Sequence, residues 1–90
     1  MIKHLNIKIY GEVQGVFFRV GAKEKADELG IFGFVKNESD GVVYIEIEGL
    51  EKLLNDFIDW CKVGPWGAKV EKVEVIGDKF KNFTEFKIVY

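Results

Sequence analysis

Cysteine, proline, histidine and arginine are scarce in this sequence, with one residue of each among its 90. A single cysteine, Cys61, excludes an internal disulfide framework and any zinc or iron–sulfur site that needs several cysteines. No apolar run approaches the roughly 20 residues of a membrane span, and the alternating N-terminus lacks the apolar block of a signal peptide. We therefore expect a soluble cytoplasmic protein that does not bind membranes.

Length and charge narrow the class further. Residues 1–90 are enough for one domain with one hydrophobic core, and we expect no second domain. The formal net charge of −2 argues against a general nucleic-acid binder, which usually carries a positive excess. The 13 basic residues are lysines except for Arg19. Arg19 is therefore a candidate for a role that only a guanidinium can fill, although one arginine can also occur by chance.

Hydrophobic periodicity predicts five strands and two helices. Residues 4–10 alternate between polar and apolar side chains, as a half-buried strand does. Residues 18–29 repeat apolar side chains at spacings of three and four, which is typical of a helix lying on a core. The remaining predicted strands are 31–37, 42–48, 69–76 and 83–90, and the second predicted helix is 50–63.

The order of these segments predicts the fold class. It is β-α-β-β-α-β followed by a C-terminal strand, which indicates an α+β, ferredoxin-like two-layer sandwich. We expect the two helices on one face of a mostly antiparallel sheet. A helix returns the chain between the first two strands, so these strands run the same way and end at the same edge of the sheet. Asp40-Gly41 between the second and third strands predicts a hairpin.

The segment Gly11–Arg19 is the first candidate site. Its two glycines, Gly11 and Gly15, can adopt backbone angles that let consecutive N–H groups point inward around an anion. The start of a helix adds free N–H groups and a positive dipole end. Arg19 can donate two parallel hydrogen bonds to a phosphoryl group. On spacing alone, the alternative is an ordinary tight loop.

Asn37 is the second candidate, because it ends the second predicted strand at the same edge as Arg19. A carboxamide has both a donor and an acceptor, so it can hold a water molecule in one orientation. The alternative is that Asn37 simply begins the hairpin turn, which is a common role for asparagine.

Three other polar side chains receive structural interpretations. His4 starts an edge-like segment, so we expect it to be exposed and to take no part in nucleophilic catalysis. Glu46 and Glu48 share one face of a strand, and we expect that face to be solvated. No carboxylates have the spacing of a metal site.

The second predicted helix and the residues after it carry further large side chains. Cys61 lies on the apolar stripe of this helix, so we expect a small core residue. Trp60 and Trp66 flank Gly64-Pro65, and we expect both to cover the open end of the core rather than to form a stacking platform.

Two motifs in this sequence resemble those of acylphosphatases. Gly11–Arg19 (GEVQGVFFR) is similar to the signature G-x-V-x-G-V-x-F-R, and Gly33–Gly41 (GFVKNESDG) is similar to G-x-V-x-N-x-x-D-G. The departures are mild, with Val20 and Gly21 after Arg19 where bulkier residues are usual, and with Trp66 after Gly64-Pro65. The agreement extends along most of the chain, at Ala26, Leu29-Gly30, Glu48-Gly49, Gly64-Pro65 and Val70–Val73.

The resemblance implies a hydrolase that cleaves the carboxyl-phosphate bond of acyl phosphates. Arg19 matches the family's phosphate-binding arginine, and Asn37 matches the asparagine that orients the attacking water. The family uses no metal or organic cofactor, and we expect a monomer whose only partner is a small-molecule acyl phosphate. The backbone of the loop matches the phosphate cradle, at Gln14, Gly15, Val16, Phe17 and Phe18.

Acyl phosphates make modest demands on an enzyme, because the carboxylate leaves as a stable anion. The site must hold the phosphoryl group and place a water molecule in line with the breaking bond. No side-chain base is evident beside Asn37, so we expect the water to transfer its proton to a phosphate oxygen of the substrate.

Two other functions are compatible with this fold. A non-catalytic module that binds an anion or ligand is one, since fold does not determine function. RNA binding is the other, but the predicted strand 42–48 offers only Tyr44 as a stacking aromatic, and the net charge is unfavourable.

Overall fold

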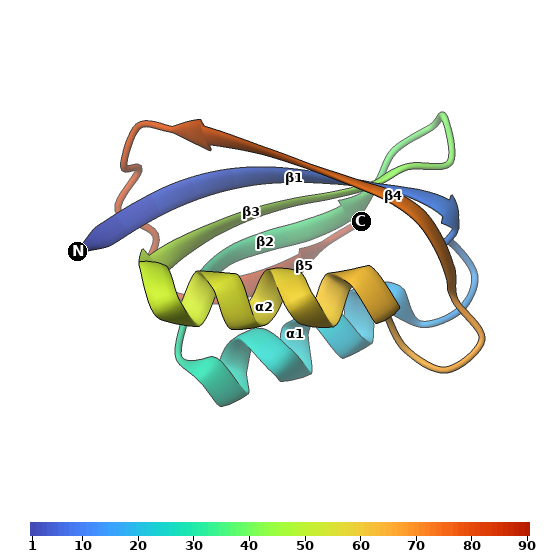
Figure 1. Cartoon of the computed structure of the whole chain (residues 1–90), viewed down its shortest axis with the longest axis horizontal. Coiled ribbons are helices and arrows are strands. Elements are labelled where there is room, and N and C mark those ends of the chain that lie inside the picture. Colours follow the sequence, from blue (N-terminus) through green and yellow to red (C-terminus); the bar gives the residue numbers. More distant parts are fainter.

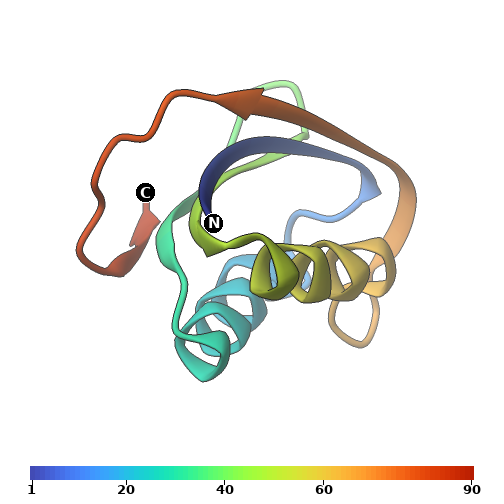
Figure 2. The same cartoon turned by 60° about the vertical axis from the view of Figure 1, so that its left-hand side comes forward.

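The computed structural model describes all residues, 1–90, and has two helices packed on one face of a five-stranded sheet (Figures 1 and 2). The elements follow the predicted order, which confirms the ferredoxin-like fold class. In chain order they are β1 (Ile2–Glu12), α1 (Phe18–Leu29), β2 (Phe32–Asn37), β3 (Val43–Leu50), α2 (Glu51–Val63), β4 (Lys69–Asp78) and β5 (Phe86–Val89).

The strand order β4-β1-β3-β2-β5 determines which loops meet. β3 is antiparallel to both β1 and β2, so β1 and β2 run in the same direction and end at the same edge of the sheet, as predicted. The β1–α1 loop and the β2–β3 turn therefore lie together at the right-hand end of Figure 1. β5 pairs with β2 in the parallel direction, which brings the C-terminus toward the same edge.

The core lies between the sheet and the two helices. Alternate residues of the central strands point toward the helices and are fully buried, among them Ile7, Ile9 and Ile45. Each helix presents one stripe of side chains to this core, and Cys61, which was predicted to be a core residue, is completely buried there. The buried helix residues are Phe18, Ala22 and Ala26 in α1 and Leu54, Phe57 and Cys61 in α2.

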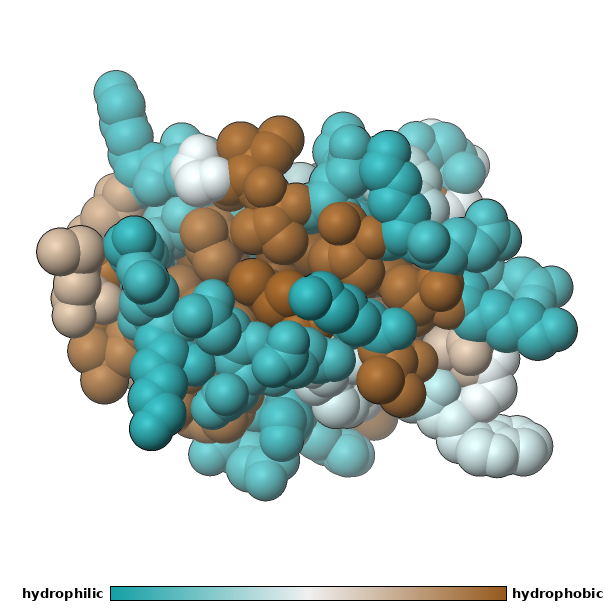
Figure 3. Space-filling model, viewed as in Figure 1, coloured by the Kyte–Doolittle hydropathy of each residue, from teal (hydrophilic) through white to brown (hydrophobic).

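One face of the molecule shows a band of hydrophobic residues between β4 and α2 (Figure 3). Leu53 of α2 and Val70 and Val73 of β4 are partly buried and pack against the core. Neither helix has the length and apolar composition that crossing a membrane requires.

Two glycines lie where a side chain would meet a neighbouring element. At Gly33 in β2, φ is +147° and a Cβ would lie 1.8 Å from the Glu46 carbonyl oxygen of β3. Gly21 in α1 faces α2, and a Cβ there would lie 2.9 Å from the Trp60 ring. Gly21 therefore leaves room for the Trp60 ring, which packs edge-on against Phe18 with the ring centroids 5.2 Å apart.

The structure corrects one expectation about the tryptophans. Trp60 packs against the core as predicted, but Trp66 is 98% exposed and covers nothing. Trp66 lies in the turn between α2 and β4, and Gly67 follows it with a positive φ of +92°. The position of Trp66 next to Gly64-Pro65 in the sequence did not indicate that this turn points away from the core.

Candidate active site

A small cavity of about 170 Å³ lies at the edge of the sheet where β1 and β2 end. Its wall comes from three segments that are distant in the sequence, namely the β1–α1 loop with the first turn of α1, the end of β2, and the C-terminus. The lining residues are Val13, Gly15, Phe17, Phe18, Arg19, Val20, Asn37 and Tyr90.

The β1–α1 loop has an unusual backbone conformation. Gly15 has φ +75°, and Phe17, which precedes the helix, has φ +62° in the left-handed region that residues with side chains seldom adopt. No side chain caps the helix, and its first turn contains no acidic residue. The backbone N–H groups from Gln14 to Val20 donate no hydrogen bond to any other group of the chain. This stretch is therefore a set of free donors at the positive end of a helix dipole, which is an arrangement suited to an anion.

Arg19 is the second residue of α1, and its half-buried side chain borders this set of donors. Its guanidinium lies over the Tyr90 ring, 4.9 Å from the ring centroid. Arg19 has no carboxylate partner, although 12 other ion pairs connect charged groups of the chain. Its five N–H donors therefore remain available to a ligand.

Asn37 is the last residue of β2 and faces the same cavity. Its Oδ1 is the one buried side-chain polar atom of the protein without a hydrogen-bond partner. Leaving such an acceptor unsatisfied costs about 1–3 kcal/mol, so native structures seldom retain one without a functional reason. A hydrogen-bond donor brought within reach of Oδ1, such as a water molecule, would remove this cost.

The structure brings most of the predicted site residues together. Gln14 and Val16 do not line the cavity, because Val16 packs against the core and the Gln14 side chain turns toward the β2–β3 turn. The predicted residues that line the cavity are Gly15, Phe17, Phe18, Arg19 and Asn37.

Sequence reasoning did not identify Tyr90 as a residue of this site. The predicted strand 83–90 includes Tyr90, but β5 ends at Val89, and Tyr90 follows it and is 93% exposed. The parallel pairing of β5 with β2 places Val89 opposite Lys36, and so carries Tyr90 to the level of Asn37. Tyr90 could have been assigned to this site only by predicting that the last strand pairs in parallel with the second.

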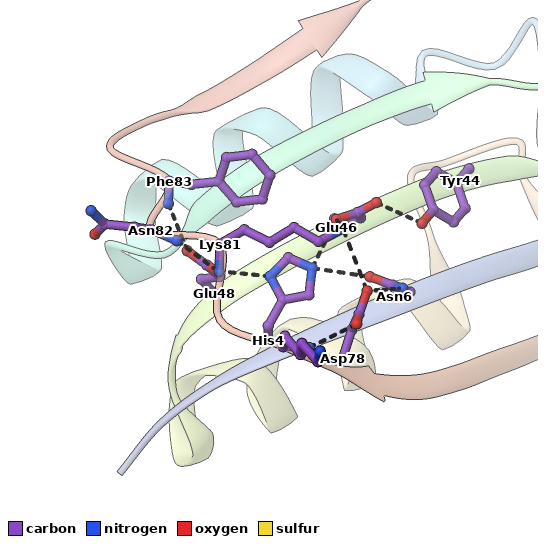
Figure 4. Close-up of polar contacts among 10 residues, drawn as sticks. His4, Asn6, Tyr44, Glu46, Glu48, Asp78, Lys81, Asn82 and Phe83 are labelled. Carbon is purple, nitrogen blue, oxygen red and sulfur yellow. Dashed lines mark hydrogen bonds and ion pairs between the residues drawn. The ribbon is translucent and has the colours of Figure 1, made fainter.

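A buried polar cluster occupies the opposite end of the sheet and overturns two expectations (Figure 4). His4 lies on a central strand and not at an edge, and its side chain is completely buried. Its Nδ1 lies 2.9 Å from Glu48 Oε2, and its Nε2 lies 2.8 Å from Glu46 Oε1 and 3.0 Å from Asn6 Oδ1. Both ring nitrogens of His4 therefore have a glutamate oxygen within hydrogen-bond distance.

The prediction that Glu46 and Glu48 lie on a solvated face is wrong. Both residues are buried, because the chain between β4 and β5 covers them. Burial by itself raises the pKa of each carboxyl. Hydrogen bonds outweigh that effect and hold both pKa values below the usual range. At Glu46 these bonds come from Tyr44, Lys81 and His4, and at Glu48 they come from two backbone N–H groups and His4.

Comparison with known proteins identifies relatives over nearly the whole chain. The family model described as Acylphosphatase matches residues 5–88. An acylphosphatase from Pyrobaculum islandicum is 48% identical over 88 residues, covering 96% of this chain and 90% of that protein. One from Ligilactobacillus salivarius is 43% identical over 91 residues, covering 99% and 100%. The crystal structure of acylphosphatase from Bacillus subtilis superposes with a TM-score of 0.95 at 36% identity, covering all of both chains.

These matches extend along nearly the whole chain and include both motifs that line the cavity. The fold, the free donors of the β1–α1 loop and the pair Arg19 and Asn37 are consistent with the family of these relatives. The chain belongs to the acylphosphatase family.

Proposed function

We propose that this protein hydrolyses acyl phosphates to a carboxylate and inorganic phosphate in the cavity between Arg19 and Asn37. The observation that carries the proposal is the coincidence of two kinds of unsatisfied group in one cavity. Free N–H donors and a guanidinium without a carboxylate partner are suited to a phosphoryl group. An orphaned acceptor, Asn37 Oδ1, is suited to a water molecule.

In the proposed reaction, the loop N–H groups and Arg19 bind the phosphoryl oxygens. The backbone donors extend from Gln14 to Phe18, as the family resemblance implies. They stabilise the charge that spreads over the equatorial oxygens in the transition state, and one such donor contributes about 10²–10³-fold in rate in comparable sites. Arg19 adds a planar pair of donors that a lysine cannot reproduce.

Asn37 holds the nucleophile. Its Oδ1 accepts a hydrogen bond from the water, whose oxygen forms a bond to phosphorus while the bond from phosphorus to the acyl oxygen breaks. The carboxylate leaves with the electron pair. No carboxylate or imidazole side chain lines the cavity, which supports transfer of the water proton to a phosphate oxygen of the substrate. We therefore expect a flat pH–rate profile in the neutral range.

The proposed enzyme acts as a monomer and without a metal ion. All the proposed contacts with substrate come from one chain, and the charge of the phosphoryl group meets N–H donors and a guanidinium. Hydrolysis of benzoyl phosphate with and without a chelator tests this directly, and equal rates are expected. Loss of activity in the chelator, restored by a divalent cation, would contradict it.

Two substitutions test the residue roles. Arg19→Lys keeps the charge and removes the paired donors, so kcat/KM is expected to fall by about 10²–10³-fold. Asn37→Ala is expected to lower kcat by about 100-fold while the inhibition constant of inorganic phosphate changes less than about 3-fold. Asn55→Ala, which removes an exposed amide from α2, is the matched control and is expected to behave as the wild type.

Each role has a result that contradicts it. Near-normal activity of Arg19→Lys would show that the guanidinium is not required. An Asn37→Ala variant that turns over normally but binds phosphate poorly would show that Asn37 binds the phosphoryl group and not the water. A protein that binds phosphate in this cavity but hydrolyses no acyl phosphate would be an anion-binding module, which is the alternative function.

A further inference from the structure

The β1–α1 loop has few bonds to the rest of the protein. Phe17 accepts one hydrogen bond from Gly21 within the start of α1, and no backbone N–H from Gln14 to Val20 donates within the chain. The ladder between β1 and β4 ends at Glu12. Free backbone donors are what anion binding needs, but they leave the position of the loop to be determined by side chains.

Gln14 makes the only hydrogen bonds between this loop and another segment of the chain. Its Nε2 donates to the carbonyl oxygen of Glu38 at 2.8 Å and to that of Val42 at 3.1 Å. These two carbonyls close the β2–β3 turn, since Glu38 O accepts from the Gly41 N–H and Val42 O accepts from the Glu38 N–H. Gln14 is half-buried and does not line the cavity.

A primary amide is matched to this place. Its nitrogen carries two hydrogens, and each has its own carbonyl acceptor. A carboxylate of the same shape has no hydrogen to donate and would place a negative charge against two carbonyl oxygens. An apolar side chain of the same length would fill the space without connecting the two segments.

The connection joins the two halves of the proposed site. Glu38 directly follows Asn37, and Gln14 directly precedes Gly15, which lines the cavity. The Gln14 amide therefore sets the separation between the free N–H groups of the loop and the orphaned Asn37 Oδ1. A misplacement of about 1 Å between reacting groups costs about 100-fold in rate.

We propose that Gln14 is a positioning residue that holds the phosphate-binding loop at the distance from Asn37 that in-line attack requires. The inference rests on the proposed function and adds a role for a side chain that does not touch the substrate. The conformation of the loop itself is determined by Gly15 and Phe17 with their positive φ angles. Loss of the Gln14 amide therefore affects catalysis more than phosphate binding.

The kinetic test separates turnover from binding. In Gln14→Met, kcat for benzoyl phosphate is expected to fall by about 30- to 100-fold, and the inhibition constant of inorganic phosphate to change by less than about 3-fold. Asn55→Met is the matched control, and it is expected to keep the wild-type kcat. Thermal unfolding of each variant establishes that it is folded at the assay temperature.

A second variant tests the need for a donor. Gln14→Glu lacks a hydrogen at neutral pH, and protonation of the carboxyl restores one donor. Its kcat relative to wild type is expected to rise as the pH is lowered, whereas that of Gln14→Met stays constant. A purely space-filling role predicts no such difference between the two variants.

Hydrogen exchange of the Gln14 side-chain amide tests the contact without using activity. In the wild type, its NMR signals are expected to exchange with water at least about 10-fold more slowly than those of the exposed Asn55, because both hydrogens are bonded. Equal exchange rates, a Gln14→Met kcat within about 3-fold of wild type, or a parallel loss of phosphate affinity and kcat would each overturn the positioning role. A wild-type protein that neither binds phosphate nor hydrolyses benzoyl phosphate would instead overturn the proposed function, and this inference with it.

Discussion

Glu48 offers a sharp test of how the sheet end opposite the cavity is held together. Its carboxylate accepts the backbone N–H groups of Lys81, Asn82 and Phe83, as well as the Nδ1–H of His4 (Figure 4). These contacts fasten the chain between β4 and β5 to β3. The perturbation is Glu48→Gln, which preserves the shape of the side chain and removes the charge.

The structure allows the cost to be worked out. The Glu48 side chain is only 2% exposed, so water cannot replace the contacts that are lost. In the Glu48→Gln variant, one side-chain oxygen becomes an NH₂ group that faces N–H donors. At least one charge-assisted hydrogen bond disappears, at about 1.5–3 kcal/mol, and a buried donor is left unpaired, at about 1–3 kcal/mol. We expect the free energy of unfolding to fall by about 3–5 kcal/mol, which also matches the cost of breaking a buried ion pair.

Differential scanning calorimetry measures the consequence. In a domain of this size, 1 kcal/mol corresponds to about 4–8 °C in Tm, so Glu48→Gln is expected to lower Tm by at least about 12 °C. Glu71→Gln, at an exposed position of β4, is the control and is expected to change Tm by less than about 2 °C. Below its Tm, the Glu48→Gln variant is expected to keep the wild-type kcat, because the cluster lies at the end of the sheet away from the cavity.

A small effect would refute this reasoning. If Glu48→Gln lowered Tm by less than about 4 °C, the carboxylate would not hold the chain between β4 and β5. If kcat fell below Tm while the fold stayed intact, the two ends of the sheet would be coupled, contrary to the expected independence.

Three further predictions concern other parts of the molecule. Gly33→Ala places a Cβ 1.8 Å from the Glu46 carbonyl oxygen at a φ of +147°, so urea unfolding is expected to show a loss of about 3 kcal/mol or more, and an unchanged midpoint would contradict this. Tyr90→Leu removes the ring beneath Arg19, so inhibition by phosphate is expected to weaken about 2–5-fold, and Tm is expected to stay unchanged because Tyr90 is exposed. An unchanged inhibition constant would show that the stacking of Arg19 on Tyr90 does not contribute to phosphate binding. The carboxyls of Glu46 and Glu48 have lowered pKa values in the folded state, so they stabilise it above about pH 4.5 and less as the pH falls through those values. Urea midpoints are therefore expected to fall on acidification, and less steeply in Glu48→Gln; parallel pH profiles for variant and wild type would argue otherwise.

Much of the fold could be predicted because its signals are local. The bounds of α1 agree with the prediction, since its apolar stripe starts at Phe18 and Gly30 ends it with a left-handed φ of +71°. The Asp40-Gly41 turn also forms where expected, with the Gly41 N–H donating to Glu38 O at 3.2 Å. Both features depend on residues close in sequence, so tertiary contacts had little to override.

Other features could not be predicted, because they depend on pairing between distant segments. Nothing in residues 83–90 alone says that β5 runs parallel to β2, and this pairing is what brings Tyr90 to Arg19. His4 was expected at an edge because the alternating pattern does not reveal that β1 lies between β4 and β3. Its burial with two glutamates needs the chain after β4 to cover that face.

The components of the proposed site are already present in the chain before it folds. They are the glycine-containing loop, a helix start without acidic residues, the only arginine and an asparagine at the end of a strand. Folding sets how they act together, because the sheet order, the Gln14 bridge and the parallel β5 fix distances between segments up to 71 residues apart, from Arg19 to Tyr90. Local preferences can specify the backbone of a loop, but only packing of distant strands can bring a cavity wall together.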